Sequence, residues 1–149
     1  MQKTHHELTP KLLGSLYTEA MLLADEARSY FDRDQMTGIV SPEISVAFSC
    51  ESLKVTTRLM HSIAWLLNQK ALRAGELSQE QADSDTRKLG YAPASDDFQV
   101  ARFPQEARSL ILASEDLYFR LQRISSKVQQ AVGPVPEPHA MMARIRASL

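Results

Sequence analysis

The chain has 149 residues, of which 44% are hydrophobic and 23% are charged, and its formal net charge at pH 7 is −1. This length fits a single domain, and the apolar content is too high for a disordered chain. The nearly neutral charge gives no overall basic field, so neither a nucleic acid nor an anionic membrane surface is an expected partner.

The first predicted helix occupies residues 9–31. Thr9 can act as the N-cap, and Pro10 suits the first helical turn, where its missing N–H would have no intrahelical partner. Apolar residues then recur every three or four positions, as on the buried face of a helix. This face holds Leu12, Leu13, Leu16, Tyr17, Ala20, Leu23, Ala24, Ala27 and Phe31.

The second predicted helix, residues 41–74, is the longest and has two apolar faces. Residues 44–48 alternate in polarity as a strand would, but a helical stripe continues far beyond the length of a strand. The first stripe contains Ile44, Phe48, Ser52, Val55, Leu59, Ile63 and Leu66, and the second contains Ala47, Cys50, Leu53, Met60, Ala64, Leu67 and Ala71. A helix that is apolar on two sides is expected at the centre of the fold, between two neighbours.

The segment after this helix, residues 76–97, is rich in Asp and Glu and is expected to be a solvated or partner-facing loop. Within it, Ser78 and Gln81 have the spacing of a capping box, which predicts a short accessory helix ending before Gly90. Residues 91–103 are expected to form an irregular loop around Pro93.

The third predicted helix covers residues 104–132 and is strongly amphipathic. Its apolar face contains Ala107, Leu110, Ile111, Leu117, Tyr118, Leu121, Ile124, Val128 and Ala131. Beyond Gly133, the prolines at 134, 136 and 138 favour polyproline geometry and prevent the helix from continuing.

Together these elements predict an all-α fold. We expect an antiparallel three-helix bundle over residues 1–133, with a short accessory helix between the second and third helices. Residues 134–149 are expected to form a flexible tail.

The cellular compartment is expected to be the cytoplasm. The single cysteine, Cys50, cannot form an internal disulfide, and the polar N-terminal residues 1–11 lack the apolar core of a signal peptide. The longest uncharged runs, near residues 62–69 and 110–114, are far too short to span a membrane.

No convincing catalytic, cofactor or metal motif is present, so an enzyme is not expected. No predicted helix contains the Glu-x-x-His pair of a di-iron bundle. Cys50 lies on an apolar stripe and is expected to be buried. The basic residues Lys54, Arg58, Lys70 and Arg73 are expected to pair with Glu19, Asp25 and Glu26 across the bundle.

His61 offers one alternative, because histidine-phosphotransfer proteins present a single exposed histidine on a helical bundle. Such domains typically place Lys and Gly shortly after that histidine, whereas here Ser62, Ile63, Ala64 and Trp65 follow. Because these residues differ from that pattern, phosphotransfer at His61 is only the second hypothesis.

A protein-binding surface is the hypothesis that the residues favour. Large apolar side chains lie outside the main stripes at Met21, Tyr30, Met36, Met60, Trp65 and Phe119, which is typical of an interface or of extra core residues. The candidate partner or dimer surface consists of Met60, Ala64, Trp65 and Leu67. The candidate recognition peptide in the tail consists of Met141, Met142, Arg144, Ile145, Arg146 and Leu149.

Three stretches resemble a known family: residues 16–32 (LYTEAMLLADEARSYFD), 49–78 (SCESLKVTTRLMHSIAWLLNQKALRAGELS) and 103–124 (FPQEARSLILASEDLYFRLQRI). They are similar to the regulator of CtrA degradation (RcdA) family, small alphaproteobacterial proteins. The resemblance implies a dimeric three-helix bundle that acts as a non-enzymatic adaptor for the ClpXP protease. It implies a protease primed by a response-regulator-like protein, cell-cycle transcription factors as cargo, and a second, cyclic-di-GMP-binding adaptor that docks on it. No cofactor and no binding residue follows from the resemblance.

Overall fold

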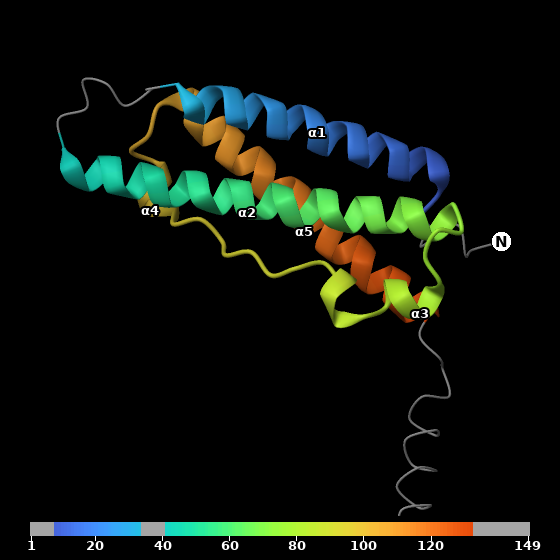
Figure 1. Ribbon diagram of the computed structural model, residues 1–149. Coiled ribbons are helices and arrows are strands. Elements are labelled where there is room, and N and C mark those ends of the chain that lie inside the picture. The colour runs from blue at the N-terminus through green and yellow to red at the C-terminus, as the bar shows by residue number, and fades with distance from the viewer. Residues whose placement is uncertain (1–7, 34–40, 133–149) are drawn as a thin grey trace, which may run out of the picture.

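The computed structural model describes residues 8–33 and 41–132, with side chains up to residue 129. Its elements are α1 (Pro10–Asp32), α2 (Pro42–Arg73), α3 (Gln79–Ala82), the 3₁₀ helix η2 (Asp85–Arg87), α4 (Asp97–Val100) and α5 (Gln105–Val132). The described residues contain helices and no strands, and α1, α2 and α5 pack together as a bundle (Figure 1). The predicted all-α three-helix fold is confirmed.

The ends of the helices follow the capping signals in the sequence. Thr9 Oγ1 accepts a hydrogen bond from the backbone N–H of Leu12 at 3.1 Å, and Pro10 begins α1. Gly75 ends α2 with a φ of +78°, a left-handed conformation that costs glycine little because it has no Cβ. Ser78 and Gln81 form the predicted capping box at α3.

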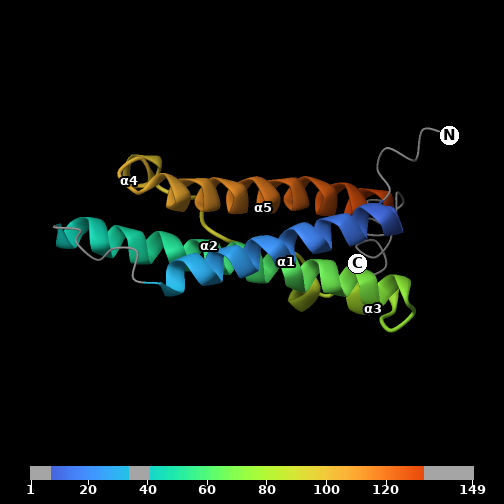
Figure 2. The ribbon, with the colours of Figure 1, turned by 90° about the horizontal axis from the view of Figure 1, so that it is seen from above.

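The direction of the third long helix differs from the prediction. The α1 helix is antiparallel to α5, since Glu19 contacts Arg120 and Arg33 contacts Glu106. The α2 and α5 helices run in the same direction, since Phe48 lies against Phe103 and Arg58 bonds Ser114 (Figures 1 and 2). The bundle is therefore antiparallel only for α1 against the other two.

The reason is that residues 74–104 return along most of α2 instead of making a tight turn (Figure 1). Hydrogen bonds mark the path: Asn68 contacts Arg87, Arg58 contacts Pro93 and Ser95, and Glu51 contacts Asp96. The segment predicted as one accessory helix and a loop contains three short helices, α3, η2 and α4.

The core lies where the three long helices meet. Its largest apolar members include an aromatic group near the start of α2, in which Phe48 lies 5.3 Å from Phe31 and 5.4 Å from Phe103 between ring centroids. Six residues of the predicted apolar face of α5 are buried: Ala107, Leu110, Ile111, Leu117, Tyr118 and Leu121. Ile124 and Val128 are partly buried against the core, and the side chain of Ala131 lies outside the described part of the chain.

One charged side chain is fully buried in this arrangement. The Arg58 guanidinium donates hydrogen bonds to the carbonyl oxygen of Pro93, to Ser95 Oγ and to Ser114 Oγ, so it joins α2, the returning segment and α5. Burial lowers the pKa of Arg58, and the nearby carboxylates of Glu115 and Glu51 oppose that shift. Arg58 thus holds the returning segment against the bundle.

The predicted ion pairs between α1 and α2 are wrong. Lys54 pairs with Glu51 on its own helix, Lys70 lies over the ring of Tyr17, and Arg73 bonds the carbonyl oxygen of Leu8. Glu19 pairs with Arg120 of α5 instead. The direction of α5 brings Arg120 next to Glu19. The sequence of α2 alone could not show that direction.

Candidate interaction surface on α2

A mostly exposed row of side chains runs along α2 on the side away from the core, and one member, Met60, also borders a hollow between α2 and α1. Four large apolar residues lie seven positions apart, and their exposed fractions are 64% for Val46, 67% for Leu53, 63% for Met60 and 46% for Leu67. A smaller residue lies four positions after each of them. We call this row the α2 stripe: Val46, Cys50, Leu53, Thr57, Met60, Ala64, Leu67 and Ala71.

The alternating spacing of four and three is that of the seam through which two helices pack in a coiled coil. The opposite side of α2 carries the core residues Phe48, Val55, Leu59, Trp65 and Leu66. Because α2 is already packed on that side, the stripe is a second apolar seam without a partner among the described residues. Contiguous exposed apolar surface of this kind marks interaction sites.

Three of the four residues predicted for this surface lie on the α2 stripe. Met60, Ala64 and Leu67 are exposed, whereas Trp65 is only 4% exposed and belongs to the core, so its assignment to the surface is wrong. The prediction that Cys50 is buried is also wrong, since Cys50 is exposed on the stripe. The seven-residue interval from Val46 to Leu67 was visible in the sequence and could have identified the row.

The other predicted surface residues divide in the same way. Met21 and Phe119 are 43% and 38% exposed, whereas Tyr30 is only 2% exposed and lies in the core. Burial raises the pKa of Tyr30, and the Glu106 carboxylate adds to that rise. Met36 lies outside the described residues, as do the predicted tail residues Met141, Met142, Arg144, Ile145, Arg146 and Leu149.

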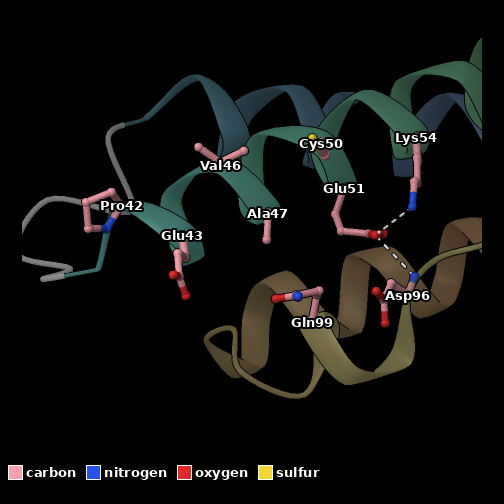
Figure 3. A pocket seen from close by; sticks show the side chains of 9 residues that line it. All are labelled: Pro42, Glu43, Val46, Ala47, Cys50, Glu51, Lys54, Asp96 and Gln99. Carbon is pink, nitrogen blue, oxygen red and sulfur yellow. Dashed lines mark hydrogen bonds and ion pairs between the residues drawn. The ribbon is translucent and has the colours of Figure 1, made fainter.

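A groove of about 550 Å³ adjoins the first half of the stripe, between α2 and α4 (Figure 3). Val46, Ala47 and Cys50 provide its apolar part. Its polar lining consists of Glu43, Glu51, Lys54, Asp96 and Gln99. Pro42, the first residue of α2, also lines it.

Glu51 is the buried charged group of this groove, with a side chain only 3% exposed. Its Oε2 accepts hydrogen bonds from Lys54 Nζ at 2.9 Å and from the backbone N–H of Asp96 at 3.2 Å (Figure 3). Burial raises the pKa of Glu51, but Ser95, Lys54 and the Asp96 backbone outweigh burial and leave the pKa below its usual value of 4.5. Its Oε1 is buried and has no hydrogen-bond partner among the described residues.

The surroundings of His61 Nδ1 are not those of a phosphoacceptor nitrogen. Its side chain is half-buried, its Nδ1 is buried without a hydrogen-bond partner among the described residues, and the ring lies directly against Gly90 of the returning segment. A phosphoryl group requires open space around the nitrogen that carries it, and Gly90 leaves no such space beside Nδ1.

Two other types of site are absent from the described residues. Within residues 8–33 and 41–132, no three His, Cys, Asp or Glu side chains are grouped so that they could hold a metal ion. Over the same part of the chain, none of the helices has the length and apolarity needed to cross a membrane.

Comparison with known proteins agrees with this architecture. The chain is similar to the crystal structure of RcdA from Caulobacter crescentus CB15, with 25% sequence identity and a TM-score of 0.59, over 83% of this chain and 92% of that one. None of the curated proteins matches this chain. The resemblance to the RcdA family found in the sequence is thereby confirmed. A family model described as "Protein of unknown function (DUF1465)" matches residues 4–147, and the chain belongs to this family.

Proposed function

We propose that this protein is a non-enzymatic, cytoplasmic adaptor that binds other proteins and delivers cell-cycle substrates to the ClpXP protease. Two observations support the proposal: the likeness to RcdA and the unpartnered apolar α2 stripe. The partners in this proposal are ClpXP, a response-regulator-like protein that primes it, and a cyclic-di-GMP-binding co-adaptor. The bundle of residues 1–133 provides the dimer surface, and the tail of residues 134–149 acts as a separate binding peptide.

We further propose that the protein is a homodimer in which the α2 stripes of two copies pack against one another. A two-fold axis uses the same surface twice, so the two α2 helices would run antiparallel. Centring the axis between Thr57 and Met60 places each large stripe residue against a small one of the second copy. The pairs are Val46 with Ala71, Cys50 with Leu67, Leu53 with Ala64, and Thr57 with Met60.

This register rests on the sizes of the stripe residues alone, because Arg73, in the last turn of α2, points away from the stripe and bonds Leu8 and Gln69. Matched large and small residues permit close approach of the two helices, as interdigitated cores require.

The dimer is tested by light scattering at micromolar concentration. The mass expected for the wild-type chain is about twice the 16.7 kDa of one copy. Replacing Met60→Glu should shift the mass toward one copy, because a carboxylate would be buried in the seam. Leu22→Glu is the matched control, since Leu22 is 64% exposed but lies on α1. A wild-type monomer would contradict the proposed dimer.

Delivery is tested in a reconstituted degradation reaction with ClpXP, its response-regulator-like primer and a cell-cycle transcription factor. The wild-type chain should accelerate loss of the cargo, and the His61→Gln variant should act equally well. The Met60→Glu variant distinguishes a role of the stripe in delivery from a role of the remaining surface. No acceleration by the wild-type chain, with or without the cyclic-di-GMP-binding co-adaptor, would contradict the adaptor proposal.

A further inference from the structure

One buried acceptor in the groove between α2 and α4, Glu51 Oε1, lacks a hydrogen-bond donor among the described residues. Glu51 is buried and its pKa is lowered, so its carboxylate only accepts hydrogen bonds at neutral pH. Oε2 receives two donors, whereas Oε1 receives none from the described residues. Ser95 lowers the Glu51 pKa but makes no hydrogen bond of normal geometry to Oε1. Buried polar atoms are paired in the great majority of cases, so the orphan oxygen indicates a missing partner.

The charge and polarity of the groove define that partner. Three acidic side chains, Glu43, Glu51 and Asp96, line the groove together with a single basic one, Lys54 (Figure 3). The rest of the lining is largely apolar, from Pro42, Val46, Ala47 and Cys50, of which Pro42 and Ala47 lie outside the α2 stripe and are not covered when two stripes pair. The matching ligand is a peptide that carries a guanidinium or ammonium group beside aliphatic side chains.

One segment of this chain has this composition. Residues 139–149 contain Arg144 and Arg146, no Asp or Glu, and the apolar side chains Met141, Met142, Ile145 and Leu149. We propose that this C-terminal segment of one copy binds the α2–α4 groove of a second copy, with an arginine donating to Glu51.

The length of the tail decides whether the groove binds the tail of the same copy or that of a second copy. The groove lies beside α4 and the start of α5, and α5 has 28 residues, so its end is roughly 42 Å away. When fully extended, the twelve residues from 133 to Arg144 span at most about 40–43 Å, and the fourteen from 133 to Arg146 at most about 46–50 Å. The tail of the same copy would thus reach the groove only in a nearly fully extended conformation.

A second copy avoids this difficulty, and here the inference rests on the proposed dimer. Because α5 is parallel to α2, the ends of both helices lie at the same end of the bundle (Figure 1). Antiparallel pairing of the α2 stripes then brings the end of α5 in one copy near the start of α2 in the other. The tail of the second copy begins close to the groove, at a high effective concentration.

Disulfide trapping in the full-length chain tests the proposal. In a Cys50→Ser background, Gln99→Cys places a thiol on the α4 wall of the groove and Ile145→Cys places one in the tail. Mild oxidation of two differently tagged versions should give a 99–145 link between chains, identified by mass spectrometry. The control replaces Gln99→Cys by Leu112→Cys, which lies on α5 and is exposed. We expect the groove link to form on the order of tenfold more than the control link.

Two further variants test the charge pairing. Arg144→Glu with Arg146→Glu should reduce the 99–145 link to the level of the Leu112 control, because the groove is acidic. Glu51→Gln should also reduce it, because the amide attracts a guanidinium less strongly than a carboxylate does. Equal yields in the groove and control positions, or full yield after charge reversal, would overturn the proposal. A link within one chain would overturn the assignment to a second copy.

Light scattering on the same samples separates the two proposals. If the chains are dimeric but the 99–145 link is at control level, tail docking is wrong and the α2 dimer stands. If the chains are monomeric and no link between chains forms, the dimer on which tail docking rests is wrong, and this inference falls with it.

Discussion

Gly90 lies so close to His61 that a Cβ atom at residue 90 would be only 2.8 Å from His61 Nδ1. Next to this contact, the Tyr118 hydroxyl donates to the Gly90 carbonyl at 2.6 Å and accepts from the Ala92 N–H at 2.9 Å. The returning segment is thus held against both α2 and α5 at one point. The returning segment cannot move away from α5 there without loss of these hydrogen bonds.

We therefore expect Gly90→Ala to lower the free energy of unfolding by about 1–3 kcal/mol, as overpacking does. Gly14→Ala is the control, because no atom lies within 4 Å of a Cβ added there and Gly14 is inside α1. That substitution should raise stability by up to about 1 kcal/mol through helix propensity. Urea denaturation measures both. A Gly90→Ala protein as stable as wild type would show that the His61 ring moves aside freely.

The loss of Arg58 should be the most damaging of these changes. Arg58→Ala leaves Ser95, Ser114 and the Pro93 carbonyl without their donor, and it leaves Glu115 without its nearby cation. Breaking such a buried group costs about 3–5 kcal/mol of unfolding free energy. Denaturant titration gives the value.

Arg28→Ala is the comparison for Arg58. The Arg28 side chain is 72% exposed and pairs with Asp25 on the same helix, so its loss should change stability by no more than about 0.5 kcal/mol. Equal effects of the two substitutions would show that Arg58 does not hold the returning segment in place.

Glu51 makes the stability depend on pH. Its pKa is lower in the folded chain than its ordinary value of 4.5, so its contribution is fully present above that value. The contribution is lost as the pH falls through the lower, folded-state pKa. Glu51→Gln should remove it, so the fall in stability between about pH 7 and about pH 3 should be smaller in the variant. Thermal unfolding across this range measures how steeply the stability falls with pH. An equally steep fall in both proteins would contradict the lowered pKa of Glu51.

Trp65 provides a direct test of its position in the core. It is the only tryptophan in the chain and is 4% exposed. We expect its native fluorescence to be emitted at short wavelength and to resist quenching by acrylamide, with a red shift on unfolding. Strong quenching in the native protein would show that Trp65 is exposed, as the sequence pattern predicts.

The α2 stripe was only partly predictable. Met60, Ala64 and Leu67 follow from the periodicity of α2, but adjacent positions on a helix with two apolar faces look equivalent in sequence. Trp65 and Cys50 were exchanged between core and surface for this reason. Which face is buried depends on where α5 and the returning segment lie, and no local pattern records that.

Local chemistry determined the three long helices and several of their ends. Thr9 with Pro10, Gly75 and the Ser78 capping box act through atoms within a few residues, so the sequence alone suffices for them. The tertiary structure decided the direction of α5, the course of residues 74–104 and the burial of Arg58. These depend on contacts between residues far apart in the chain, such as Arg58 with Ser114, whose stabilisation exists only once the helices have packed.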